Sequence, residues 1–264
     1  MTFARANGIV LHHQTLGRRG SPAVVFLNSL GSDMRIWQEI VPAFSDRFRI
    51  VLYDKRGHGL SDAPPAPYRI DDHVDDLVAL LDHLQVERAV FVGVSVGGMI
   101  AQRLAVRAPD RVEALVLCDT AAKIGTPEMW SERIGAVEST GIESIADRIL
   151  ERWFTAGFRQ SRTEDYAGWK NMLVRTPAHG YTGTCASIRD ADLTADAGTI
   201  RAPTLCVVGD QDGSTPPDLV RQTASLIPGA RFEIIANAGH IPSIEQPAAL
   251  IRLIDQHLRE NERV

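Results

Sequence analysis

The chain has 264 residues, 44% apolar and 23% charged, with a formal net charge of -5 from 28 basic and 33 acidic residues. This composition excludes a mainly disordered chain, and the acidic balance disfavours nucleic acid as a partner. The longest near-continuous apolar run, residues 89–101, is shorter than the roughly 18 residues of a membrane-spanning helix and contains glycines. Because no charged stretch followed by an apolar one opens the sequence, we expect a cytoplasmic protein without a membrane partner.

The cysteines, Cys118, Cys185 and Cys206, are three in number, widely spaced and free of any C-x-x-C pairing. This pattern predicts small buried side chains and neither disulfides nor zinc ligands. We expect no metal and no cofactor.

The first third of the sequence is typical of strands joined by turns. Four short runs have the composition of strands, at residues 3–6, 9–13, 23–27 and 49–53. The Asn7-Gly8 pair between the first two predicts a hairpin, because both residues tolerate a positive φ. The last two runs carry little polar alternation, which favours strands of a parallel sheet that is covered on both faces.

From residue 70 onward, helical and strand patterns alternate. Apolar residues recur at helical spacing over residues 71–84, 96–108, 217–227 and 247–257. Buried strands are predicted at residues 89–94, 114–118, 203–208 and 231–235.

The middle of the chain differs from its two flanks. Residues 123–195 hold three of the four tryptophans and have helical patterns without a convincing strand. We therefore expect an α/β fold, with a mostly parallel central sheet flanked by helices. Residues 1–122 and 196–264 would form the core, and residues 123–195 a helical cap inserted into it.

The segment Gly93-Val94-Ser95-Val96-Gly97 stands between a predicted strand and a predicted helix. This G-x-S-x-G pattern is typical of a nucleophile elbow, where a strained turn presents the serine hydroxyl above the sheet. Glycines two residues on either side of the serine remove Cβ atoms that would collide in so tight a turn. The pattern predicts Ser95 as a nucleophile; a glycine-rich turn that binds a phosphate, or nothing, is the alternative.

A serine nucleophile needs a base, and the base needs a carboxylate that orients it. His240 follows the last predicted strand, where a loop can carry it over the sheet edge. Asp212 lies in the loop after the strand at residues 203–208 and is our preferred acid. Asp210, at the tip of that strand, could instead cap the turn, and Asp119 after the strand at residues 114–118 is a third candidate.

Attack on a carbonyl places negative charge on its oxygen, which backbone N–H groups can stabilise. Val96 follows the nucleophile, so its amide would be one donor. Leu30, in the loop after the strand ending at Leu27, would supply the other, although it could also be an exposed leucine in a plain turn.

Over essentially its whole length, the sequence resembles the α/β-hydrolase superfamily and, more narrowly, the 3-oxoadipate enol-lactonases of aromatic catabolism. The resemblance is carried by Asn28-Ser29-Leu30-Gly31, residues 53–62, Pro67-Tyr68, the elbow, residues 119–125 and Arg152-Trp153-Phe154. It implies an α/β-hydrolase fold with Ser95, Asp212 and His240 as the catalytic triad. Three positions depart from the residues expected of these lactonases. Leucine is expected in place of Val94, methionine or leucine in place of Val96, and asparagine in place of Asp119.

The resemblance implies a five-membered enol-lactone with a carboxylate side arm as substrate and 3-oxoadipate as product. An acidic protein needs a local cation to hold such a substrate. Lys123, Arg133 and Arg189 are candidates for that cation, with ordinary surface positions as the alternative. Trp130 and Trp153 would either line the pocket or form the core of the cap.

Other functions remain open at this stage. A carboxylesterase, a carbon–carbon bond hydrolase or a perhydrolase would use the same triad, and a small-molecule receptor with slow turnover would retain it. The expected partner is a small-molecule ester or lactone, and a homo-oligomer is compatible with the sequence.

Overall fold

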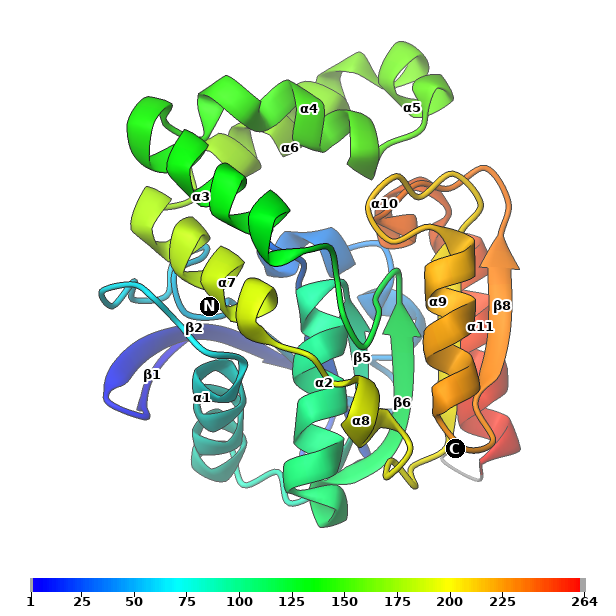
Figure 1. Cartoon of the computed structure of the whole chain (residues 1–264). Helices are drawn as coiled ribbons and strands as arrows, with labels where there is room; N and C mark the ends of the chain where they lie inside the picture. Colours follow the sequence, from blue (N-terminus) through cyan, green and yellow to red (C-terminus); the bar gives the residue numbers. More distant parts are fainter. Residues whose placement is uncertain (1, 262–264) are drawn as a thin grey trace.

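The structure, a computed structural model, describes residues 2–261 and is built around one eight-stranded sheet (Figure 1). Across the sheet the strands are ordered β1-β2-β4-β3-β5-β6-β7-β8. Their bounds are β1 (Thr2–Ala6), β2 (Ile9–Leu16), β3 (Ala23–Leu27), β4 (Arg49–Tyr53), β5 (Ala89–Val94), β6 (Val112–Cys118), β7 (Thr204–Gly209) and β8 (Arg231–Ile235). The β1–β2 and β2–β4 pairs are antiparallel and all others are parallel, which confirms the expected sheet.

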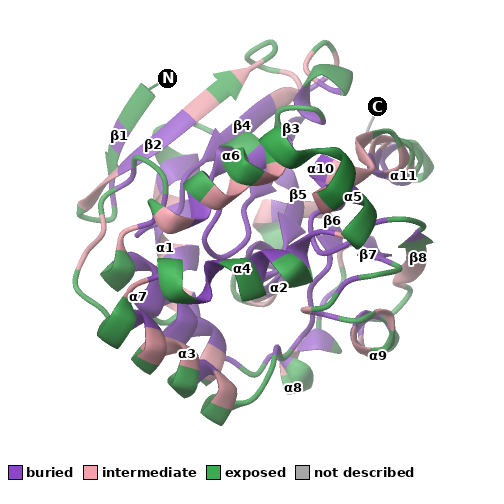
Figure 2. Cartoon of the chain, turned by 90° about the horizontal axis from the view of Figure 1, so that it is seen from above, coloured by how far each residue is buried: buried purple, intermediate pink, exposed green. Residues whose placement is uncertain are grey.

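Helices cover both faces of this sheet, so its central strands are buried on both sides. Every residue of β3, β5 and β7 is buried, as their continuous apolar sequences require. Figure 2 shows α1, α2 and α9 on one side of the sheet and α11 on the other. The core helices are α1 (Ile70–His83), α2 (Val96–Arg107), α8 (Thr194–Ala197), α9 (Pro217–Leu226), α10 (Pro242–Glu245) and α11 (Pro247–Glu260), with 3₁₀ turns η1 (Met34–Trp37), η2 (Val41–Ala43) and η3 (Pro109–Arg111).

The observed elements agree closely with the predicted ones, and the largest differences are at the ends of β2 and α11, which each continue three residues further than predicted. The predicted strand stops at His13, where Gln14 and Thr15 interrupt the apolar pattern. In the structure β2 continues to Leu16, because β4 pairs with it from His13 onward and satisfies its backbone groups.

Most of the segment between β6 and β7 folds into helices that lie above the carboxyl ends of the strands (Figure 1). These helices are α3 (Pro127–Thr140), α4 (Glu143–Trp153), α5 (Ala156–Ser161), α6 (Thr163–Val174) and α7 (Ala178–Asp190). We refer to α3 to α7 as the cap helices. The predicted end of the cap, residue 195, lies within α8, which packs against α2 and α9 of the core.

One very close contact between the cap helices and the core lies at Gly57. A Cβ atom on Gly57, in the loop after β4, would lie 2.5 Å from the Cα of Gly180 on α7. Glycine on both sides therefore sets how near α7 can come to this loop.

Among residues 2–261, no helix is both long and apolar enough to cross a membrane.

Candidate active site

Ser95 stands at the turn between β5 and α2, in a backbone conformation that is rare for a residue with a side chain. Its φ is 58° and its ψ is -121°. Two hydrogen bonds hold the turn: the Ser95 N–H donates to the Cys118 carbonyl at 3.0 Å, and the Thr120 hydroxyl donates to the Ser95 carbonyl at 2.6 Å. Strain that is fixed by its surroundings in this way often marks a functional position.

The glycines that flank Ser95 leave no space for side chains. A Cβ on Gly93 would lie 2.5 Å from the Gly97 carbonyl oxygen, and one on Gly97 would lie 2.3 Å from the Leu27 carbonyl oxygen. Because both obstacles are backbone atoms, a larger residue could be accommodated only by opening the turn. The geometry is that of the strained elbow expected from the sequence.

His240 and Asp212 are joined at the carboxyl ends of β7 and β8. Both side chains are buried, and the His240 Nδ1–H donates to Asp212 Oδ1 and Oδ2, at 3.0 and 2.9 Å. Asp212 also accepts from the amides of Ser214 and Thr215, at 2.7 and 3.1 Å, and from the Thr215 hydroxyl at 2.6 Å. A carboxylate fixed by these donors holds the imidazole with Nε2 free to accept a proton.

The other candidate acids have different contacts. Asp210 accepts from the Ala238 amide at 3.1 Å and so secures the loop that leads to His240. Asp119 is buried beside the His240–Asp212 pair, with one oxygen within 4.8 Å of both Asp212 and His240. These three side chains are also the only group of metal-ligating type among the described residues. A metal ion there would compete with the protein donors that already surround Asp212.

Ser95 and His240 line one small cavity beneath the cap helices, with a volume of about 60 Å³. Among residues 2–261, no hydrogen bond joins the Ser95 hydroxyl to His240, and such contacts commonly tighten only when substrate binds. The cavity is lined by Ser29, Leu30, Ser95, Ile124, Gly125, Met129, Trp130, Arg133, Ile149, Arg152, Trp153, Tyr181, Ser214 and His240.

The two predicted oxyanion donors belong to residues near Ser95 in the chain or in the cavity. Val96 is the first residue of α2, where backbone N–H groups have no partner within the helix. Leu30 lines the cavity from the loop after β3. We propose these amides as the oxyanion hole, since Val96 follows the serine and Leu30 lines the cavity that the serine also lines.

The loop that carries Leu30 is held from behind by two residues that sequence reasoning did not single out. The Lys55 ammonium donates to the Ser29 carbonyl at 2.5 Å, and the Gly31 amide donates to His58 Nε2 at 2.9 Å. Burial lowers the pKa of Lys55 to about 7 and the pKa of His58 well below its usual range. A neutral His58 can therefore accept from Gly31, and Leu30 is held between two anchored neighbours.

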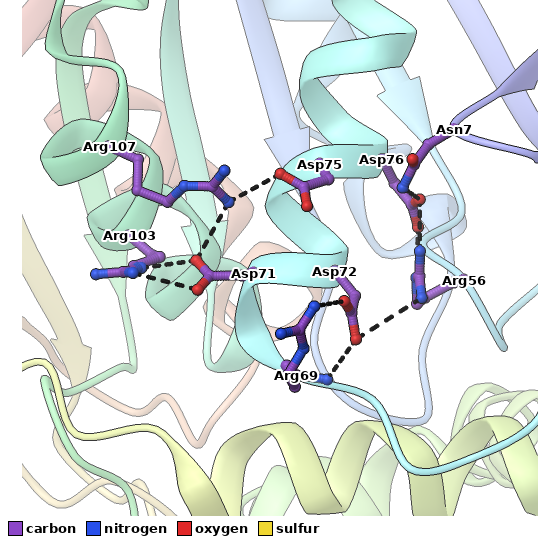
Figure 3. A network of polar contacts seen from close by, with 9 residues as sticks. All are labelled: Asn7, Arg56, Arg69, Asp71, Asp72, Asp75, Asp76, Arg103 and Arg107. Atoms are coloured by element: carbon purple, nitrogen blue, oxygen red, sulfur yellow. Dashed lines mark hydrogen bonds and ion pairs between the residues drawn. The ribbon is translucent and has the colours of Figure 1, made fainter.

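An ion-pair network in turn secures the loop after β4 that carries Lys55 and His58 (Figure 3). Arg56, in this loop, donates to both oxygens of Asp76 on α1, at 2.6 and 2.7 Å, and Asn7 donates to the same carboxylate. The β4 loop, the β1–β2 hairpin and α1 are thus tied together behind the oxyanion loop.

The Lys55→Met variant should show whether this support matters for catalysis. Loss of one oxyanion donor typically costs about 10²–10³ in kcat, so a displaced Leu30 amide should cost roughly 10- to 100-fold with KM little changed. We would measure kcat and KM on p-nitrophenyl acetate. Lys170→Met, on the exposed side of α6, is the matched control. An unchanged kcat in a folded Lys55→Met protein would contradict the role.

The structure separates the three cations suggested by the sequence. Lys123 pairs with Asp192 at 2.9 Å and Arg189 with Asp190 at 2.7 Å, and neither is among the residues that line the cavity. Arg133 does line the cavity, with its guanidinium 4.8 Å from the centre of the Trp130 ring.

A second arginine in the cavity wall, Arg152, was missed as a candidate cation. It lies one residue before Trp153 near the end of α4. The sequence signal that could have identified Arg152 is its place in the Arg152-Trp153-Phe154 stretch, which carries part of the resemblance to the enol-lactonases. Two tryptophans, Trp130 and Trp153, line the cavity and are also buried in the hydrophobic core. Each therefore both lines the pocket and takes part in core packing, the two alternatives that the sequence left open.

The cavity wall carries unbalanced positive charge. Within residues 2–261, neither Arg133 nor Arg152 forms an ion pair with a carboxylate. Burial lowers the pKa of Arg152, and the positive charges of Arg133 and Arg148 lower it further. An anionic group bound in the cavity would relieve this repulsion.

Comparison with known proteins places the chain in a family. Residues 22–137 and 150–247 match the family model of the alpha/beta hydrolase fold. With its fold and this match, the chain belongs to the α/β-hydrolase family and is a carboxylic ester hydrolase.

Its relatives include enol-lactonases. It is 36% identical to 3-oxoadipate enol-lactonase 2 of Acinetobacter baylyi, over 95% of this chain and 93% of the relative. The crystal structure of the enol-lactonase from Burkholderia xenovorans LB400 superposes with a TM-score of 0.95 at 38% identity, covering 98% of this chain and 100% of that one. Est816, described as an N-acyl homoserine lactone degrading enzyme, superposes with a TM-score of 0.88 at 30% identity, covering 97% and 99% of the two chains.

Proposed function

We propose that this hydrolase opens a small enol-lactone that carries a carboxylate side arm, converting 3-oxoadipate enol-lactone to 3-oxoadipate in the degradation of aromatic compounds. Ser95 would be the nucleophile, His240 the general base and Asp212 the carboxylate that orients the base. The observation that carries the proposal is the pair of arginines, Arg133 and Arg152, in the wall of the cavity that Ser95 and His240 share. The similarity to enol-lactonases supports the same substrate class.

The geometry suggests how the reaction proceeds. His240 Nε2 takes the proton of the Ser95 hydroxyl as the serine oxygen attacks the lactone carbonyl, and the amides of Leu30 and Val96 stabilise the oxyanion. The ring C–O bond then breaks and the enolate leaves. It takes up at carbon the proton that His240 had accepted from Ser95, so the enolate becomes a ketone and His240 is again a neutral base. His240 next activates a water molecule, which releases the acyl group from Ser95 as the second carboxylate of the product.

The enolate makes this reaction easier than amide hydrolysis. Because an enolate is a good leaving group, little protonation by His240 is needed when the ring C–O bond breaks. Asp212 holds the imidazolium form of His240 that arises when Ser95 gives up its proton.

The size of the cavity suits such a substrate. About 60 Å³ is open to the centre of a water molecule. A buried water needs about 10–15 Å³ of such space, so there is room for roughly five waters. So small a cavity favours a small ring over a long acyl chain, which would require the cap helices to move.

Replacing the two arginines tests the substrate class. Arg133→Met and Arg152→Met remove the charge but keep an unbranched side chain. Each should lower kcat/KM for the carboxylated enol-lactone by roughly 10- to 100-fold, the value of one charged hydrogen bond. The neutral p-nitrophenyl acetate should be hydrolysed within about threefold of the original rate.

Arg148→Met, on the exposed side of α4, is the control, because it removes the same charge outside the cavity lining. Equal losses on the charged and neutral substrates would argue for a general carboxylesterase instead. No turnover of any ester would favour a receptor.

A further inference from the structure

Asp119, which the proposed reaction does not use, is buried directly behind the His240–Asp212 pair. It follows β6, is fully buried and has a positive φ of 48°. The Gly209 amide donates to its Oδ1 at 2.9 Å. Its Oδ2 is buried and, among residues 2–261, has no hydrogen-bond partner within normal distance.

The groups that face Asp119 offer no positive partner for an ionised carboxylate. Asp212 comes from the loop after β7 and Glu245 from α10, and both are acidic. His240 approaches from the loop after β8, and the Cys118 thiol precedes Asp119 in β6. Two ionised carboxylates at this separation in a buried site would repel each other strongly.

Burial raises the pKa of Asp119 well above its usual range, and the negative charge of Asp212 raises it further. Oδ1 already accepts from Gly209, so the proton belongs on Oδ2, the oxygen without a partner. The acceptor beside it is the carboxylate of Asp212.

We propose that Asp119 is a positioning residue that carries a proton on Oδ2 at neutral pH and donates it in a hydrogen bond to the carboxylate of Asp212. The proposal rests on the proposed role of Asp212. Held in this way, Asp212 keeps the negative charge that orients His240, and no second charge lies beside the imidazole. In the competing arrangement Asp119 is ionised and orients His240 itself.

Asp119→Asn separates these two arrangements. The asparagine amide can donate to Asp212 as the protonated acid does, while its carbonyl oxygen still accepts from Gly209. If Asp119 acts as a neutral donor, Asp119→Asn should have a kcat on p-nitrophenyl acetate within about threefold of that of the unmodified protein. Asp119→Ala removes the donor and should lose roughly tenfold or more in kcat with KM little changed.

Two measurements need no substrate. In the infrared spectrum at neutral pH, the unmodified protein should show the C=O band of a protonated carboxylic acid, which Asp119→Asn should lack. If a variant does not fold, the same C=O band can be followed in the unmodified protein alone as the pH is raised. The band should disappear when Asp119 loses its proton.

The second measurement is the melting temperature against pH. The ordinary pKa of Asp119 is 3.8, so above this pH the folded chain retains a proton that the unfolded chain has lost. Stability therefore falls as pH rises, and Asp119→Asn removes this loss. The gain in melting temperature of Asp119→Asn should grow as the pH rises from about 5 to neutral. Asp46→Asn, exposed between η2 and β4, should show no such trend.

The proposal is overturned if the infrared band is missing, if the gain in melting temperature does not grow with pH, or if Asp119→Asn abolishes activity. These outcomes differ from a failure of the proposed function, which would appear as an inactive lactone assay or a fully active Asp212 variant.

Discussion

Ser95→Ala is expected to lower kcat on p-nitrophenyl acetate by about 10⁴-fold or more, because removing a serine nucleophile leaves only substrate binding and oxyanion stabilisation. The melting temperature should hardly change, since alanine and serine meet the same backbone strain at a φ of 58°. Steady-state kinetics with thermal melts of both proteins would measure the two effects.

Labelling with a fluorophosphonate provides the control for this prediction. The probe should label the original protein and Ser225→Ala, which changes an exposed serine on α9, but not Ser95→Ala. If Ser95→Ala hydrolysed the ester at the original rate, another residue would be the nucleophile.

Asp212→Asn should lower kcat by roughly 10³–10⁴-fold while leaving the fold intact. An asparagine that turns its NH₂ group toward His240 Nδ1 stabilises the wrong imidazole tautomer, so that Nε2 carries a proton and cannot accept one from Ser95. The measurement is kcat on p-nitrophenyl acetate over a range of pH.

Asp218→Asn, in the exposed first turn of α9, is the matched control and should retain full activity. Full activity of Asp212→Asn together with an inactive Asp119→Asn would transfer the role of the acid to Asp119.

The strands and core helices could be predicted from the sequence because local patterns determine them. Runs such as residues 23–27 are apolar throughout and form β3, which is buried on both faces. The glycine at position 93 likewise follows from a local steric need, because its Cβ would meet the Gly97 carbonyl, whereas Gly97 is required by its close approach to Leu27 of β3. β2 was predicted too short because its last residues are held by β4, more than 30 residues further along the chain.

The supporting residues of the site could not be predicted in the same way. Lys55 and His58 act on a loop about 25 residues earlier in the chain, and only the folded structure brings them together. Arg152 was missed for a related reason, because which side of α4 faces the cavity depends on how the cap helices pack. The net charge of -5 gave no sign that the cavity wall is positive.

The preference between two lactones tests the proposed substrate most directly. Enol-lactone generated in situ from muconolactone would be compared with α-angelica lactone, a neutral five-membered enol-lactone, by ultraviolet absorbance against the spontaneous rates. We predict that the protein hydrolyses the carboxylated lactone with a kcat/KM at least about 10-fold higher, the contribution of one charged contact. No acceleration of its hydrolysis, by protein that still turns over p-nitrophenyl acetate, would contradict the proposed substrate.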